Sequence, residues 1–342
     1  MITEFSENYL KGRSYSSNDV KTLIEGHFDL IIMSSTWDRR CVCIIENDLS
    51  ADYSIMLKFK LRDEYGLQDD HDEKIYNYLL KITKNKPIKE IFEESINVDK
   101  FTILLSDKIY DVFLNNKGQM NVLLDLSTCP RYYALSILAI LICHGLISKL
   151  TISYAEGIYS HKDLGCSNKL SFSKGKWKTI PISSFSQISD PEKMKYLMVS
   201  IGYEGNKTIR AVNRVDPNRI SILFPDPGVT KEHVKKVDVA NEELLEFYKV
   251  PENQIVRVHA ADAIGVWKSL SEANLEKPEE NIFYLCCGTK PHAIGLALRA
   301  ISLGHPKVLY NIPSGGHSFV DVEPYGVYWK YEIEDISALP NK

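Results

Sequence analysis

The amino-acid sequence predicts an α/β fold, with two tandem Rossmann-like parallel-sheet domains related by internal duplication. Two observations predict it. Short continuous apolar runs, as expected of strands buried on both faces of a parallel sheet, alternate with helical patterns along most of the 342 residues. In addition, one strand, turn and helix occurs twice, because residues 124–131 align without a gap onto residues 285–292.

The first domain is expected over residues 1–156. Residues 1–26 are polar and are interpreted as a short cap on it. Phe28–Met33 is the first apolar run, and the Ser34-Ser35-Thr36 that follows it can cap a helix. Glu73–Thr83 has a helical pattern with apolar side chains on one side. On the same grounds the sequence predicts further strands at Ser54–Phe59, Met120–Leu126 and Leu150–Tyr154, and further helices at Arg39–Glu46, Phe101–Phe113 and Tyr132–Cys143.

Residues 157–194 interrupt this alternation. The segment holds glycines, serines and lysines, as a loop does, but Phe172 and Trp177 are too apolar for a free linker. It is interpreted as an ordered connecting excursion between the domains, and a β-hairpin is one form that it can take.

The alternation restarts in the second domain, residues 195–342. Tyr325–Ile333 is expected to add an antiparallel edge strand at its end. The other predicted strands are Lys195–Ile201, Ile220–Phe224, Gln254–Val258, Ile282–Cys287 and Lys307–Ile312, and the predicted helices are Asn206–Val215, Lys231–Tyr248, Asp262–Ser271 and the apolar stretch after Gly288.

The internal repeat is clearest at two turns, Ser127-Thr128-Cys129-Pro130 and Gly288-Thr289-Lys290-Pro291. Each turn follows an apolar strand, and each places a proline at the start of a helix, where its missing N–H would have had no partner. Matched leucine, alanine and isoleucine positions continue along both helices. The first turn lacks counterparts of Gly288 and Lys290, so a pair of sites built on these turns would be asymmetric.

Composition and motifs exclude several classes of protein. A net charge of −4 argues against a chain that coats nucleic acid through bulk charge, although it leaves room for a local basic pocket. The seven cysteines lack paired C-x-x-C spacings, so no metal is expected. G-x-G-x-x-G and P-loop motifs are absent from the sequence, and no cofactor is expected. The longest apolar run, Tyr132–Ile147, is interrupted by His144-Gly145, and the N-terminus has no secretory signal, so a cytoplasmic protein without membrane association is expected.

The turns after the strands supply the candidate binding residues, because ligands of a doubly wound sheet lie beyond the carboxyl ends of its strands. Backbone N–H groups at a helix start, together with a cation, can hold a phosphate, and a base can stack on an aromatic ring. Helix capping and turn formation are the competing interpretation of each single turn. The predicted ligand-binding residues are Ser34, Ser35, Trp37, Arg39, Ser127, Thr128, Arg131, Gly202, Tyr203, Glu204, Gly288, Thr289, Lys290 and His292.

A catalytic role is a second hypothesis. Asp226 lies between two prolines, and Glu204 lies between Tyr203 and Gly205, so both carboxylates are candidates for acid–base chemistry together with His292. The candidate reaction is hydrolysis of, or group transfer to, a nucleotide or nucleic acid. No spacing joins the three residues, so the sequence leaves open whether the protein is an enzyme.

The Cys287-Gly288-Thr289-Lys290 turn resembles that of the CARF domains of prokaryotic antiviral systems, which have a Gly-Thr-Lys turn after a core strand, near a bound cyclic oligonucleotide. Two such units in one chain resemble the SAVED sensor domains, which are fused CARF-like pairs. The resemblance implies that Gly288, Thr289 and Lys290 contact a ligand, with Ser127-Thr128-Cys129 as their first-repeat counterpart. The chain departs from the pattern at Cys287, where a glycine is usual, and no recognisable nuclease or other effector domain is attached.

We therefore expect a nucleotide- or oligonucleotide-binding, sensor-type component of a bacterial antiviral defence system. Its expected partners are a nucleotide or cyclic oligonucleotide and an effector protein of the same system, and the sequence is compatible with a homo-oligomer. A scaffold subunit of a defence complex is the remaining alternative.

Overall fold

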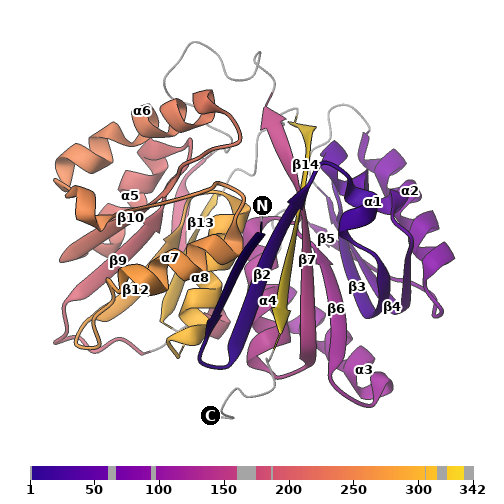
Figure 1. The fold of residues 1–342 in the computed structure, drawn as a ribbon. Helices are drawn as coiled ribbons and strands as arrows, with labels where there is room; N and C mark the ends of the chain where they lie inside the picture. The colour runs from indigo at the N-terminus through magenta and orange to yellow at the C-terminus, as the bar shows by residue number, and fades with distance from the viewer. Residues whose placement is uncertain are drawn as a thin grey trace. The chain divides into compact units, whose positions relative to one another are not determined.

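The computed structural model describes residues 2–60, 67–93, 98–159, 175–185, 188–304, 306–313 and 322–334. The chain forms two compact units, one of Met1–Asp163 with Phe319–Lys342 and one of Leu164–Ser318. Each unit contains one sheet with helices packed on it, so the predicted α/β fold class is confirmed (Figure 1). None of the described helices combines the length and apolar character needed to cross a membrane.

The first unit has an eight-stranded sheet in the order β1-β2-β14-β7-β6-β3-β4-β5. Its parallel strands are β3 (Gly26–Ser35), β4 (Leu49–Lys60), β5 (Ile88–Glu93), β6 (Met120–Asp125) and β7 (Ile147–Tyr159). Three antiparallel strands extend the sheet beyond β7, namely β14 (Val322–Glu334), β2 (Leu10–Ser17) and β1 (Ile2–Glu7).

Two expectations for this unit are corrected by the structure. Tyr325–Ile333 is antiparallel, as expected, but it lies inside the first sheet between β2 and β7 rather than at the edge of the second domain. Its inward side chains explain this position, because Trp329 and Tyr331 are buried. Residues 2–17 form a β-hairpin rather than only a cap. The sequence does not predict this hairpin because its residues are mostly polar.

The helices of the first unit pack in two groups. η1 (Arg39–Glu46, a 3-10 helix) contacts α2 (Leu67–Ile82), and α3 (Val98–Asn116) contacts α4 (Arg131–Cys143). The short α1 (Val20–Leu23) also packs on η1. Beneath η1 and α2, a core is formed by apolar side chains that include Ile31, Met33, Ile75 and Leu79.

The second unit has a six-stranded sheet in the order β11-β10-β9-β12-β13-β8. Five strands are parallel, namely β9 (Lys195–Ser200), β10 (Arg219–Pro225), β11 (Ile255–Val258), β12 (Asn281–Cys286) and β13 (Lys307–Pro313). β8 (Trp177–Pro181) is antiparallel to β13 at the edge. The connecting excursion therefore supplies an edge strand, and the remainder of the predicted hairpin, residues 160–174, lies outside the described residues.

The helices of this unit also form two packed pairs. α5 (Gly205–Val215) contacts α6 (Lys231–Phe247), and α7 (Ala263–Ala273) contacts α8 (Lys290–Ser302). Short 3-10 turns, η2 (Ser183–Phe185) and η3 (Glu252–Gln254), precede β9 and β11. Val212 of α5 and Leu244 of α6 are buried against the sheet. Each such side chain stabilises the fold by about 1.5–3 kcal/mol.

The parallel strands have the same order in both units. Counted along the chain, the order is third, second, first, fourth, fifth, and it reverses between β3 and β6 in one unit and between β9 and β12 in the other. The two matched turns, residues 127–130 and 288–291, follow β6 and β12 and so occupy equivalent positions. Because many doubly wound sheets share this order, internal duplication stays a prediction.

Candidate functional site

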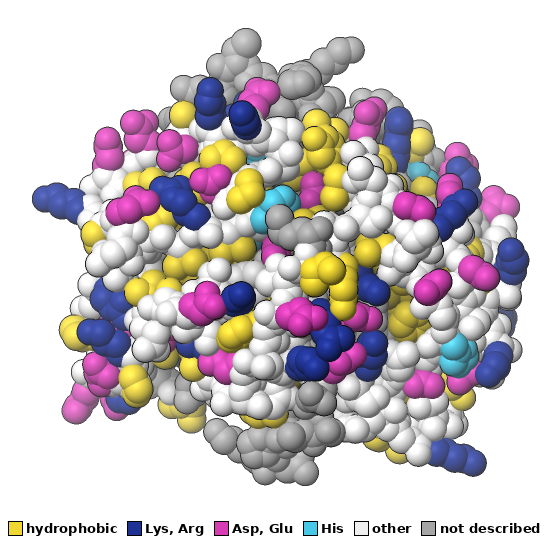
Figure 2. Space-filling view, viewed as in Figure 1, with side chains coloured by type: hydrophobic (Ala, Val, Ile, Leu, Met, Phe, Trp, Pro, Cys, Tyr) yellow, Lys and Arg dark blue, Asp and Glu magenta, His cyan; other side chains and the backbone are white. Residues whose placement is uncertain are grey.

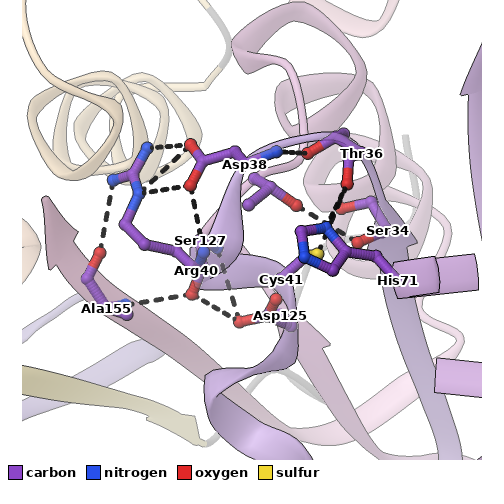
Figure 3. A network of polar contacts seen from close by, with 10 residues as sticks. Ser34, Thr36, Asp38, Arg40, Cys41, His71, Asp125, Ser127 and Ala155 are labelled. Carbon is purple, nitrogen blue, oxygen red and sulfur yellow. Dashed lines mark hydrogen bonds and ion pairs between the residues drawn. The ribbon is translucent and has the colours of Figure 1, made fainter. Parts of the chain in front are cut away.

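The turns at the strand-order reversal of the first unit contain an internal polar network (Figure 3). Asp38 accepts a hydrogen bond from the Arg40 backbone N–H at 3.0 Å and forms an ion pair with its guanidinium at 2.6 Å. Asp125 accepts from the hydroxyls of Ser127 and Ser153, each at 2.8 Å. The Ser127 hydroxyl also accepts from the Ala155 N–H at 3.0 Å. The contacts of Asp125 and Ser127 join the ends of β6 and β7, and the Arg40 guanidinium reaches the same place by donating to the Ala155 carbonyl at 3.4 Å.

Four predicted binding residues lie within or beside this network. Ser34, Ser35, Ser127 and Thr128 are each at most 6% exposed. The Thr128 hydroxyl donates to the Ser34 carbonyl at 3.1 Å. The Ser35 hydroxyl donates to Asp72, which also forms an ion pair with Lys58. The Thr128 and Ser35 hydroxyls thus connect elements of the unit to one another.

The first-unit turns are therefore poorly suited to an anion. The carboxylates Asp38, Asp72 and Asp125 are all buried at this edge of the sheet, and the first two already neutralise the Arg40 and Lys58 cations that an anion would need. The remaining predicted residues here lie further out. Trp37 and Arg131 are half-buried, and Arg39 is exposed.

In the second unit the turns after β9 and β12 pack backbone against backbone. A side chain at Gly288 would place its Cβ 2.9 Å from the Ile201 carbonyl oxygen, and one at Gly202 would come within 3.1 Å of the Cys287 carbonyl oxygen. The Gly288 N–H donates to the Ser200 hydroxyl at 3.0 Å. The two glycines thus permit close packing of the turns, and the N–H predicted to orient a phosphate is bound within the protein.

Thr289 caps α8. Its hydroxyl accepts from the His292 backbone N–H at 3.3 Å and donates to the Ala260 carbonyl at 2.6 Å. Both functions of the hydroxyl are internal, so Thr289 positions the start of α8 against the β11–α7 turn. Lys290, the half-buried first residue of α8, lies directly after this cap.

The start of α5 lies beside the start of α8, because β9 and β12 are neighbouring strands. Glu204 precedes α5 and forms an ion pair with Lys207 in its first turn. The Lys207 ammonium also lies 4.4 Å from the centroid of the Trp177 ring. Two helix N-termini and two lysines therefore lie at the strand-order reversal, where backbone N–H groups and helix dipoles favour negative charge.

Three histidines lie at the same edge of the sheet. His292 is fully buried, and its Nε2 donates to the His259 carbonyl at 3.1 Å. Burial lowers the pKa of His292 to about 4 and that of His233 also to about 4. The rings of Tyr203 and His233 lie 4.9 Å apart, centroid to centroid. Tyr203 is thus part of the wall of this region, and the buried histidines are neutral near pH 7.

The three catalytic candidates do not form one acid–base set. Glu204 is paired with Lys207, Asp226 lies 3.9 Å from Arg257, and His292 is bound to the His259 carbonyl. A general acid or base must come within hydrogen-bond reach of its substrate. The fully buried His292 has no exposed surface from which to do so.

One group of potential metal ligands exists among the described residues. His27, Asp29 and Asp52 have their ligand atoms within 4.8 Å of one another at the amino ends of β3 and β4. Asp52 already forms an ion pair with Lys84 at 2.6 Å, and Asp29 accepts a hydrogen bond from the Asn121 backbone N–H at 2.6 Å. Because both carboxylates have partners within the protein, the proximity of these three side chains is not evidence that they bind a metal.

Two residues of the second-unit site are missing from the sequence-predicted set. The sequence could have indicated Lys207, because it lies three residues after Glu204, a spacing at which opposite charges on a helix form an ion pair. The sequence could not have indicated Trp177. Its position beside the site depends on the pairing of Trp177 with Pro313 at the carboxyl end of β13.

No protein-family model matches the sequence, and no curated protein matches it significantly. Among solved structures, a protein described as a universal stress protein from Pseudomonas aeruginosa UCBPP-PA14 is 7% identical with a TM-score of 0.23, over 83% of this chain and 92% of that one. A functionally unknown protein from Pseudomonas aeruginosa PAO1 has the same identity and TM-score over 86% and 94%. A likeness this weak supports no statement about function.

Proposed function

We propose that the second unit binds a phosphorylated nucleotide or oligonucleotide at the carboxyl ends of β9 and β12, as a sensor-type component of a bacterial antiviral defence system. The supporting observation is the meeting of two helix N-termini at the strand-order reversal. α8 begins with Lys290, and α5 has Lys207 in its first turn. Doubly wound sheets bind ligands at this position, and helix N-termini bind phosphate.

The residues of this edge take different roles in the proposal. Lys290 contacts the phosphate through its ammonium group. Gly288, Gly202 and Thr289 shape the turns, because their close contacts are with the protein itself. Tyr203 offers a ring for a base beside the helix starts.

The setting of the proposal comes from the sequence. The Gly288-Thr289-Lys290 turn is the part that resembles CARF domains, and the proposed recipient of the signal is an effector protein of the same system. The face drawn in Figure 2 shows acidic and basic side chains interspersed over the described residues, as suits local recognition of a small anionic ligand better than coating of a long nucleic acid.

Isothermal titration calorimetry of the full chain with cyclic and linear oligonucleotides tests this function. We expect Lys290→Ala to weaken binding by about tenfold or more, because a charge-assisted hydrogen bond to phosphate is lost. Lys277→Ala is the matched control, since Lys277 is exposed in the loop before β12, at the opposite end of that strand. Equal binding by all three proteins, or binding by none, contradicts the proposal.

A further inference from the structure

The ion pair of Glu204 and Lys207 occupies the place where a ligand anion is expected. Both side chains are 15% exposed, so the pair is largely withdrawn from water. Glu204 is the residue immediately before α5, and its carboxylate therefore lies near the positive end of the helix. An internal carboxylate paired with a lysine at a helix start has the same charge arrangement as a bound phosphate.

Trp177 completes this contact. The ring lies under the Lys207 ammonium, and the Arg214 guanidinium donates to the Trp177 carbonyl, which ties β8 to α5. The indole Nε1 is buried, and among the described residues it has no hydrogen-bond acceptor. A buried donor without an acceptor is unfavourable. The Lys207 ammonium lies over the face of the ring, whereas the indole N–H points outward in the ring plane, so an anion on Lys207 can supply this acceptor only if one of its oxygens reaches past the ring edge.

We propose that Glu204 is an internal competitor for the ligand. Before binding, its carboxylate holds Lys207; on binding, an oxyanion of the ligand takes Lys207 and accepts from the Trp177 indole N–H, and Glu204 is released. This inference rests on the proposed function, because it assumes that Lys290 holds a second anionic group at the neighbouring turn. The ligand class that satisfies both lysines has two linked phosphates, as in a diphosphate or an oligonucleotide.

The competition makes a directional prediction for Glu204→Gln, which keeps the size of the side chain and removes its charge. We expect this variant to bind inorganic pyrophosphate about 3- to 10-fold more tightly than the wild type, because Lys207 no longer has to leave a carboxylate. Lys207→Met should weaken pyrophosphate binding. Orthophosphate, which reaches one lysine at a time, should gain less from Glu204→Gln.

Calorimetric titration of the full chain with pyrophosphate and orthophosphate provides the test, with thermal melting to confirm that each variant is folded. Glu279→Gln is the charge-matched control, because Glu279 is exposed in the loop before β12. Tighter pyrophosphate binding by Glu204→Gln but not by Glu279→Gln supports the inference. Pyrophosphate binding by Glu204→Gln that is no tighter than the wild type overturns it, even where Lys290→Ala loses binding and the proposed function holds. Tighter binding by Glu204→Gln with unchanged binding by Lys290→Ala instead supports the competition and refutes the role of Lys290.

Discussion

The glycine at position 288 is required by packing within the protein rather than by contact with a ligand. The sequence indicates close approach of a ligand to the backbone, whereas the structure shows close approach of the neighbouring turn. A Cβ at Gly288 would lie 2.9 Å from a carbonyl oxygen, and backbone cannot rotate away as a flexible side chain can. The glycine therefore supports the site through the packing of the turns that form it.

Gly288→Ala tests this packing. Overpacking of a close contact typically costs about 1–3 kcal/mol, so we expect the free energy of unfolding to fall by about that amount in urea denaturation. Gly118→Ala is the control, because a Cβ at Gly118 would meet nothing within 4 Å. Equal free energies of unfolding for the two variants would contradict this, because they would show that the turns after β9 and β12 can move apart without loss of stability.

His292 makes stability depend on pH. Burial lowers its pKa to about 4, against an ordinary value of about 6.5. Between these values the unfolded chain binds the proton and the folded chain does not, so the stabilising contribution is fully present above about pH 6.5 and is lost as pH falls toward about 4. The loss from this residue amounts to about 3 kcal/mol over the whole window.

Unfolding free energies at pH 7 and pH 5 measure this contribution. We expect stability to fall less steeply between these pH values in His292→Gln than in the wild type, whatever its absolute stability. His144→Gln, at an exposed histidine, is the matched control for replacing a histidine by glutamine. The explanation fails if His292→Gln loses as much stability as the wild type over the same interval.

At the scale of the elements, the sequence predicts the parallel strands best. β3, β6, β9 and β12 are buried on both faces and appear as continuous apolar runs. β5 and the β1–β2 hairpin are not predicted, because charged and polar side chains interrupt them. The partners of β14 and β8 also escape prediction, since pairing between distant segments leaves no local pattern.

In the candidate site too, local features can be predicted from the sequence, whereas contacts between distant segments cannot. The Gly288-Thr289-Lys290 turn is placed correctly at a helix start by local signals: an apolar strand, a glycine and a proline. The internal bonds of Thr289 and the contact of Trp177 with Lys207 depend on register between elements. The sequence therefore predicts where the site lies better than what each residue does there.

The placement of β14 predicts a local response to Trp329→Ala. Trp329 is 2% exposed, and its indole N–H donates to Glu156 of β7 at 2.6 Å. Loss of this side chain should cost about 3–5 kcal/mol. In hydrogen–deuterium exchange, β2 and β7 should then exchange faster, while β9 and β12 should not. Faster exchange confined to β9 and β12 would place β14 with the second unit.

At the scale of the whole molecule, the two units share a strand order but differ at its reversal. The first unit fills that position with hydroxyls and buried carboxylates bonded to one another. Both units have two helix starts there: η1 and α4 of the first unit begin at Arg39 and Arg131, and α5 and α8 of the second unit have Lys207 and Lys290 in their first turns. The internal bonding of the first unit is the reason that we propose the second unit as the place where the ligand binds.

The most direct measurement is the perturbation of amide and indole chemical shifts when the isotopically labelled full chain is titrated with pyrophosphate. We expect the largest shifts at residues 203–207, at residues 288–292 and at the Trp177 indole N–H, with residues 127–131 unchanged. Shifts centred on residues 127–131, or no shifts at saturating pyrophosphate, would contradict a phosphate-binding site in the second unit.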